Sequence, residues 1–162
     1  MRGSIDTLER MSVLEIVVIG PNPSCIRCET TLKRAQSAAA SFVDESVGVM
    51  KVFSRTEDAE KYGKVESGHE IETIGNVEPD RAKMDLIWEE LDRLDADDES
   101  NADRIDTLLK ELDLAIAAVR QRAEELGYLM TPVLVVNGKV KSAGYTPGEE
   151  EIRRWIKVEL AE

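Results

Sequence analysis

The stretch SVLEIVVIG, residues 12–20, restricts the possible folds of this chain more than any other feature. It is a run of mostly β-branched apolar residues ending at a Gly-Pro pair, which is typical of a strand buried on both faces. A helix is expected over residues 25–43, and VGVMKVFS at residues 47–54 predicts a second strand. Because a helical crossover favours parallel strands, this part is expected to form a parallel β-α-β unit.

The C-terminal part predicts an antiparallel hairpin followed by a helix. Strands are expected at residues 133–136 and 139–142, on either side of Asn137-Gly138. Asn-Gly is the pair most typical of a two-residue type I′ turn. A Pro residue and three Glu residues mark the start of the last helix, residues 147–160. The two parts together predict an α/β protein with one mixed four-stranded sheet flanked by helices.

The middle of the chain, residues 55–125, is expected to be an insertion between these parts. A helical turn or two is expected after residue 55, and a short hairpin around Ser67-Gly68. An antiparallel helical hairpin is predicted over residues 80–125, where two helical patterns are separated by the acidic stretch DADDESNAD. The second pattern is a heptad-like seam of Ile105, Leu109, Leu112, Ile116, Val119, Ala123 and Leu126.

Several roles for this helical hairpin are open. Its apolar stripes can pack against each other and the sheet, and Trp88 is interpreted as such a core residue. The seam can instead form a homodimer interface. The acidic surface can dock a partner, or the helices can cover an active site.

The only cysteines, Cys25 and Cys28, have C-x-x-C spacing. Ser24 is expected to cap the helix, which would place Cys25 in the first turn. Unpaired backbone N–H groups and the helix dipole stabilise a thiolate there, and Arg27 adds a positive charge between the cysteines. In this interpretation Cys25 is the nucleophile, and Cys28 resolves the mixed disulfide one turn later.

A metal site is the second interpretation of the pair, and a chance spacing is the third. Zinc usually takes four nitrogen or sulfur ligands. The single histidine, His69, is interpreted as a solvated loop residue. A zinc site within one chain is therefore disfavoured, whereas a site shared by two chains stays open.

Composition and charge narrow the function classes. The net charge of −12 argues against binding to nucleic acid or to an anionic membrane. No apolar run reaches the roughly 20 residues that cross a bilayer, and residues 1–10 lack the apolar core of a signal peptide. Those ten residues are interpreted as a leader or a disordered N-terminus. A cytoplasmic location is predicted, where stable structural disulfides are rare.

Thr131-Pro132 stands directly before the predicted strand at residues 133–136. Proline removes a hydrogen-bond donor, so its place before an apolar strand is unusual. A cis peptide bond would explain it, and a trans proline at the start of an edge strand would explain it as well.

The segments MSVLEIVVIGPNPSCIRC and MTPVLVVNGKVKSAGYTPGEEEIRRWI resemble the small thioredoxin-like redox-active disulfide proteins of archaea and bacteria. The resemblance covers roughly residues 11–54 and 126–160. It implies a thioredoxin-like fold with Cys25 as the attacking thiol and Cys28 as the resolving thiol. It also implies a cis Thr131-Pro132 bond packed beside the cysteines.

The chain departs from that family in three ways. Ser24 and Ile26-Arg27 replace the Trp and Gly-Pro of ordinary thioredoxins, which leaves the reduction potential open. The strand before the cysteines offers only Glu15 as a counterpart to the buried acid of thioredoxins. About seventy residues stand where the small family has a short helix.

The predicted organisation is a thioredoxin-like domain of residues 11–54 and 126–162, interrupted by the insertion at residues 55–125. The predicted function is a thiol-disulfide oxidoreductase that needs no cofactor beyond its cysteine pair. Ser24, Ile26, Arg27, Thr131 and Pro132 are the expected active-site loop residues. Protein or small-molecule disulfides are the expected substrates, with a thiol reductase as electron donor. The alternative is a non-catalytic binding module, in which the pair holds a metal or the insertion recruits a partner.

Overall fold

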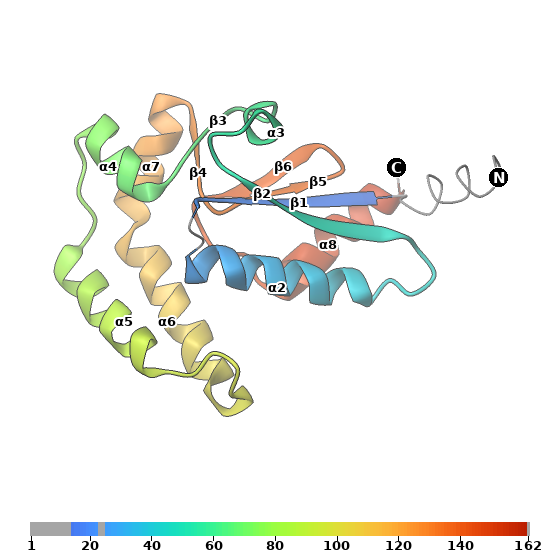
Figure 1. Ribbon diagram of the computed structural model, residues 1–162, viewed down its shortest axis with the longest axis horizontal. Coiled ribbons are helices and arrows are strands. Elements are labelled where there is room, and N and C mark those ends of the chain that lie inside the picture. Colours follow the sequence, from blue (N-terminus) through green and yellow to red (C-terminus); the bar gives the residue numbers. More distant parts are fainter. Residues whose placement is uncertain (1–13, 23–24, 162) are drawn as a thin grey trace.

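The computed structural model describes residues 14–22 and 25–161. A mixed four-stranded sheet of order β2-β1-β5-β6 forms its centre (Figure 1). β1 (Leu14–Gly20) and β2 (Val47–Phe53) are parallel. β5 (Val133–Val136) runs antiparallel to β1, and β6 (Lys139–Ala143) runs antiparallel to β5. The predicted architecture, with a parallel pair and an antiparallel hairpin in one sheet, is confirmed.

Apolar layers cover both faces of this sheet. Helices α2 (Ile26–Ala40) and α8 (Glu149–Ala161) pack against each other and against one face (Figure 1). The single-turn helix α3 (Glu57–Glu60) and the short strand β3 (Lys64–Glu66) contribute apolar side chains to the other. The side chains of β1 alternate between the two layers, which explains its nearly continuous apolar run.

The hairpin between β5 and β6 turns at Asn137 and Gly138. Their φ angles are 54° and 77°. A type I′ turn requires positive φ at both central residues, so this part of the prediction is confirmed.

The expected hairpin around Ser67-Gly68 is wrong. β3 pairs in parallel with β4 (Tyr128–Met130), which lies more than sixty residues later in the chain. Ser67 instead caps helix α4 (Gly68–Gly75), where its hydroxyl accepts a hydrogen bond from the Glu70 amide. Sequence patterns indicate local turns more readily than pairing of distant strands, and glycine next to Ser67 is as typical of a turn as of a helix start.

The predicted helical hairpin consists of α5 (Arg81–Arg93), the 3₁₀ turn η1 (Glu99–Asn101) and two consecutive helices, α6 (Ala102–Ala115) and α7 (Ala117–Leu126). A single helix was expected in place of α6 and α7. The structure explains the interruption. The Ala115 carbonyl accepts a hydrogen bond from the Asp80 amide, and the Val119 amide, which would donate to Ala115 in a continuous helix, donates to the Ile116 carbonyl. Diversion of one carbonyl from the helical ladder is a recognised cause of a kink.

The heptad-like seam packs inside the chain. Its members from Ile105 to Ala123 are buried with the apolar faces of α4 and α5 in one cluster. Helix α5 contacts α6, and α4 contacts α7. The seam residues are therefore buried between helices of the same chain. A homodimer through the insertion stays a prediction and would have to use other surface residues.

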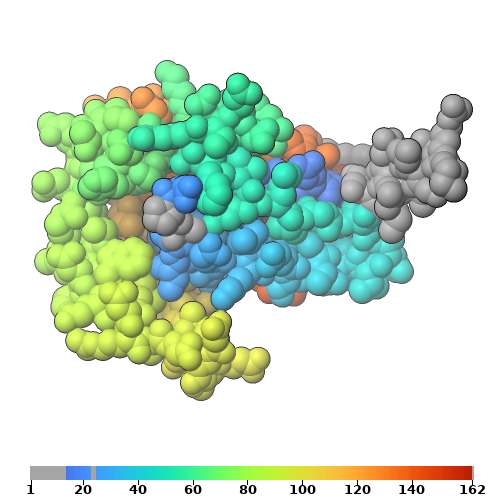
Figure 2. All heavy atoms as spheres, viewed as in Figure 1, coloured from blue at the N-terminus to red at the C-terminus, as the bar shows by residue number. Residues whose placement is uncertain are grey.

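These helices stand at the end of the sheet where β1 ends and α2 begins (Figure 1). In the space-filling view the green and yellow segments of α4 and α5 flank the blue start of α2 (Figure 2). Among residues 14–22 and 25–161, no helix combines the length and the apolar character needed to span a bilayer.

Candidate active site

The cysteine pair lies at the N-terminus of α2. Cys25 itself is the N-cap, with extended backbone angles, and the helix begins at Ile26. The predicted cap, Ser24, lies outside the described residues, and Cys25 is therefore one position earlier than expected. Cys28 is fully buried and Cys25 is half-buried. Both are free thiols, and their sulfur atoms are 3.4 Å apart, within hydrogen-bond reach.

This arrangement separates the two thiols by acidity. The pKa of Cys25 is lowered from 9.0 to about 6, chiefly because the neighbouring Cys28 thiol donates a hydrogen bond to its thiolate. Burial opposes this effect, while the amides of Cys28 and Arg27 and the Arg27 charge add to it. The pKa of Cys28 is raised by its hydrogen bond to Cys25 and by burial. Cys25 is thus the thiol that ionises first.

Gly20 and Cys28 pack in direct contact. A Cβ atom at Gly20 would lie 2.8 Å from the Cys28 sulfur and 2.9 Å from its Cβ. Such distances are far shorter than a normal van der Waals contact. Glycine at the end of β1 therefore allows the first turn of α2 to approach the sheet closely enough to bury the second thiol.

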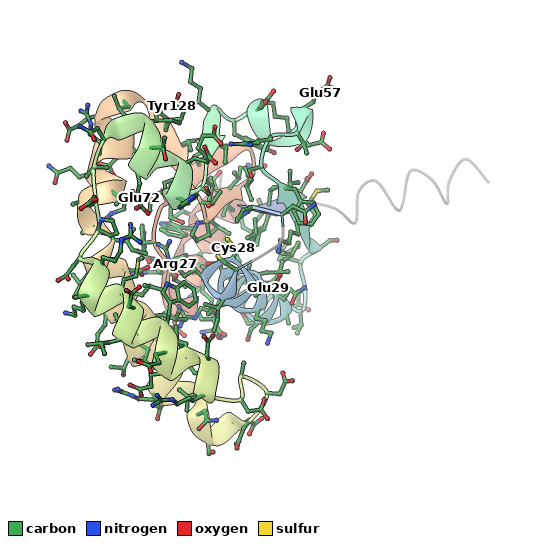
Figure 3. The ribbon with its side chains drawn as sticks, turned by 60° about the vertical axis from the view of Figure 1, so that its left-hand side comes forward. Arg27, Cys28, Glu29, Glu57, Glu72 and Tyr128 are labelled. Carbon is green, nitrogen blue, oxygen red and sulfur yellow. The ribbon has the colours of Figure 1, made fainter. Side chains whose placement is uncertain are left out.

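Arg27 extends from the first turn of α2 into the interior, toward the inserted helices (Figure 3). Its Nε and Nη2 donate to one oxygen of Asp113, at 3.2 and 3.0 Å. Its Nη2 also donates to the Gly144 carbonyl at 2.5 Å. The other oxygen of Asp113 accepts a hydrogen bond from the Thr146 amide. Asp113, on α6, thus joins the insertion to the residue between the cysteines and to the loop before α8.

The Thr131-Pro132 peptide bond is cis, and both residues are buried. The Thr131 amide donates to the Glu66 carbonyl at the end of β3, at 3.0 Å. The Pro132 carbonyl accepts from the Gly144 amide at 3.1 Å. Glu66 directly precedes Ser67, the N-cap of α4, so this hydrogen bond links the cis-Pro turn to the start of α4.

A cavity of about 260 Å³ opens in front of Cys25. Thr131 and Arg27 belong to its lining, so the structure brings them together with Cys25. Ile26 instead packs against the apolar cluster of the insertion and does not line this cavity.

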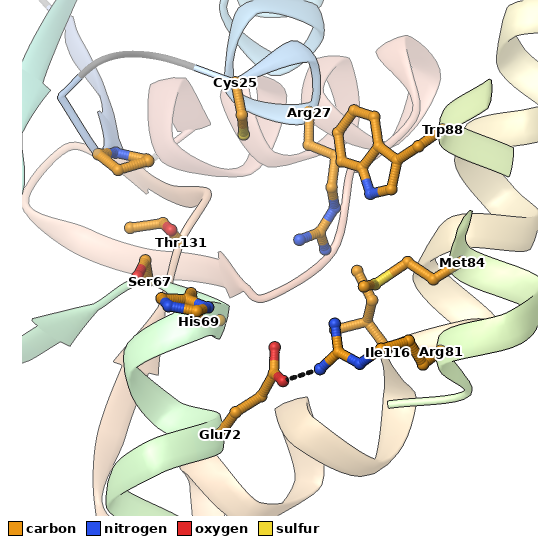
Figure 4. Close-up of a pocket in the computed structure, with 12 residues that line it drawn as sticks. Cys25, Arg27, Ser67, His69, Glu72, Arg81, Met84, Trp88, Ile116 and Thr131 are labelled. Carbon is orange, nitrogen blue, oxygen red and sulfur yellow. Dashed lines mark hydrogen bonds and ion pairs between the residues drawn. The ribbon is translucent and has the colours of Figure 1, made fainter. Parts of the chain in front are cut away.

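Most of the cavity wall comes from the insertion, and the sequence prediction missed these residues. His69 and Glu72 on α4 lie on one side, with Met84 and Trp88 of α5 on the other (Figure 4). Ile116 closes the cavity between them. His69 is exposed, as predicted, but it lies in the first turn of α4 and not in a loop. Trp88 has one face toward the cavity (Figure 4). The helical spacing of α5 identified Trp88 as inward-facing, but periodicity does not reveal what an inward face contacts.

Glu15 does not act as a counterpart of the buried acid of thioredoxins. It is exposed near the start of β1, and its carbonyl accepts from the Asn137 amide at the far end of the sheet. Lys51 on β2 forms an ion pair of 2.7 Å with Glu29 on α2. The positive charge of Arg27 and, to a smaller extent, that of Lys51 favour the Cys28 thiolate, which partly offsets the rise in the Cys28 pKa.

The described residues, 14–22 and 25–161, bear on the metal interpretation of the cysteine pair. Within them no group of three or more His, Cys, Asp or Glu side chains converges on one point. A shared site between two chains stays a prediction.

The sheet order, the helix that begins at the cysteine pair and the cis-Pro turn beside it together define a thioredoxin-like fold. A family model described as a thioredoxin domain matches residues 107–157, from within α6 to α8. The chain is a thioredoxin-fold protein, as its sequence predicted. The matched region contains Thr131-Pro132 but not the cysteine pair. Searches of curated proteins and of solved structures returned no significant match.

Proposed function

We propose that this protein is a thiol-disulfide oxidoreductase in which Cys25 attacks and Cys28 resolves. The observation that carries the proposal is the position of Cys25. It caps a helix with its sulfur 3.4 Å from the buried Cys28 sulfur, and its pKa is lowered to about 6. A thiol of this acidity is mostly ionised at neutral pH, and the thiolate is the reactive form.

The reaction proceeds in two exchange steps. The Cys25 thiolate attacks one sulfur of a substrate disulfide, whose other sulfur leaves with the bonding electron pair as a thiolate. The Cys28 thiol then gives up its proton to solvent, and its sulfur attacks the Cys25 sulfur in the mixed disulfide. This releases the second substrate sulfur as a thiolate, leaves a Cys25–Cys28 disulfide and reduces the substrate by two electrons.

Protein or small-molecule disulfides are the substrates under this proposal. A thiol reductase or a dithiol returns two electrons to the Cys25–Cys28 disulfide after each turnover. The dithiol-disulfide couple carries the chemistry without a further cofactor.

Trapping of the mixed disulfide tests this assignment. In Cys28→Ser the first step should proceed and the second should not, so a covalent adduct of protein and substrate should accumulate. Cys25→Ser should form no adduct at neutral pH, because Cys28 is fully buried, and burial both limits access to its sulfur and disfavours its thiolate. Mass spectrometry after reaction with a model disulfide measures both results. An unreactive Cys25, together with stoichiometric metal in the purified protein, would favour the binding-module alternative.

A further inference from the structure

The cavity in front of Cys25 has an apolar wall. Met84 and Trp88 contribute a thioether and an aromatic group to one side of it, and Ile116, which closes the cavity, contributes an aliphatic group (Figure 4). All three come from the insertion, and all three also border its apolar cluster. The wall is therefore held in place by the packing of α5 against α6.

The arginine and glutamate side chains of the cavity are paired within the protein. Arg27 is paired with Asp113, and the Arg27 side chain is only 6% exposed. Glu72 is paired with Arg81 at the opposite end of the cavity from Cys25 (Figure 4). A charged ligand group would have to compete with these existing pairs, whereas an uncharged apolar group would not.

The size of the cavity limits its occupant. Pockets for drug-sized ligands have volumes of roughly 300–1,000 Å³, and this cavity measures about 260 Å³. It has room for one large side chain or a group of that size.

We propose that the cavity selects disulfides in which an uncharged apolar group lies next to the sulfur that Cys25 attacks. This inference rests on the proposed oxidoreductase function and adds its substrate class. The apolar group inserts between Met84, Trp88 and Ile116, which holds the attacked sulfur against the Cys25 thiolate. The group can belong to a peptide, as the residue after a cysteine, or to a small thiol compound.

A set of mixed disulfides with 2-nitro-5-thiobenzoate tests the proposal. This group is the better leaving thiolate, so the Cys25 thiolate attacks the other sulfur and coloured thiobenzoate is released. The peptide arm uses acetyl-Cys-Phe, acetyl-Cys-Ser and acetyl-Cys-Glu amides. The non-peptide arm uses 2-phenylethanethiol and 2-mercaptoethanol. Each rate is divided by the rate of the same disulfide with dithiothreitol, which removes differences in intrinsic reactivity.

The apolar members should react about tenfold faster than the polar members after this correction, as expected for partial burial of one large apolar side chain. A preference in both arms means that the apolar group alone is sufficient for recognition. A preference in the peptide arm alone supports peptide disulfides as the substrates. Equal corrected rates for all members would overturn the inference while leaving the oxidoreductase proposal intact. Absence of thiobenzoate release from every member would instead contradict the oxidoreductase proposal itself.

Variants on α5 connect the preference with the wall. Trp88→Ala should reduce the tenfold preference to threefold or less. Leu86→Ala is the matched control, because Leu86 lies two residues earlier on the same helix and is 67% exposed. Met84→Lys provides a second test that does not depend on a large deletion, since it should shift the preference toward the Glu peptide. An unchanged preference in both Trp88→Ala and Met84→Lys would contradict the assignment of this wall.

Discussion

Replacement of Asp113 by Ala should strongly destabilise the protein, because Asp113 is the acceptor that compensates a buried guanidinium. Its carboxylate accepts two hydrogen bonds from Arg27 and one from the Thr146 amide. Without it, the Gly144 carbonyl is the one hydrogen-bond acceptor that Arg27 keeps among residues 14–22 and 25–161. The variant therefore removes the carboxylate that is paired with this buried positive charge.

The expected loss follows from the burial of the pair. Removal of one partner from a buried ion pair costs about 3–5 kcal/mol of the free energy of unfolding. The Asp113 side chain is 18% exposed, so the lower end, about 3 kcal/mol, is expected. With a urea m-value of about 2 kcal/mol/M, this lowers the unfolding midpoint by about 1.5 M.

Asp106→Ala is the matched control on the same helix. Asp106 pairs with Arg34, but its side chain is 53% exposed. Exposed pairs contribute about 0–1 kcal/mol, so the unfolding midpoint should fall by no more than about 0.5 M. Urea unfolding of the reduced protein, followed by circular dichroism, measures both variants.

A double-mutant cycle separates the ion pair from general damage to α6. Arg27→Met removes the buried charge, so Asp113→Ala should cost about 2 kcal/mol less in that background than in the wild type. Equal midpoints for Asp113→Ala and Asp106→Ala, or purely additive effects in the cycle, would refute this role of Asp113.

Three further predictions concern the cysteines. Gly20→Ala should destabilise the protein by about 1–3 kcal/mol, because the added Cβ atom clashes with Cys28. Gly48→Ala is the control, since a Cβ atom there meets no atom within 4 Å. Equal urea midpoints for the two variants would contradict the close packing of Gly20 against Cys28. Cys28→Ala should move the pH midpoint of Cys25 alkylation upward by more than Arg27→Met does, because the Cys28 hydrogen bond is the larger cause of the lowered Cys25 pKa. A larger shift in Arg27→Met would contradict this ranking of the two causes. Since the folded-state pKa of Cys25 is lowered, its thiolate contributes stability that is fully present above pH 9 and is lost as the pH falls through about 6. The urea midpoints of reduced wild type and Cys25→Ser should therefore diverge between pH 6 and 9. Parallel plots of the two midpoints against pH would contradict this linkage.

The sequence was sufficient for the parts of the fold that depend on local patterns. The apolar run of β1 and the Asn137-Gly138 turn each have one favourable local structure, and both formed as predicted. The kink at Ile116 was not predictable, because it depends on a hydrogen bond between the Asp80 amide and the Ala115 carbonyl. Those residues are thirty-five positions apart, so no local pattern contains the information.

The candidate site divides in the same way. Cys25 and Cys28 could be identified from their spacing and from the helix that follows them. The wall formed by His69, Met84 and Trp88 could not, because it depends on how the inserted helices are placed against α2. The parallel pairing of β3 with β4 sets part of that placement, and it joins segments more than sixty residues apart.

The pH dependence of Cys25 alkylation tests the central claim most directly. Reduced protein is exposed to limiting iodoacetamide from pH 4 to 10, and mass spectrometry follows modification of Cys25 alone. The rate should rise with a midpoint near pH 6 and reach its plateau by neutral pH, where about 90% of this thiol is ionised. A midpoint at or above about 8.5, the value of an ordinary cysteine, would contradict the assignment of Cys25 as an activated nucleophile.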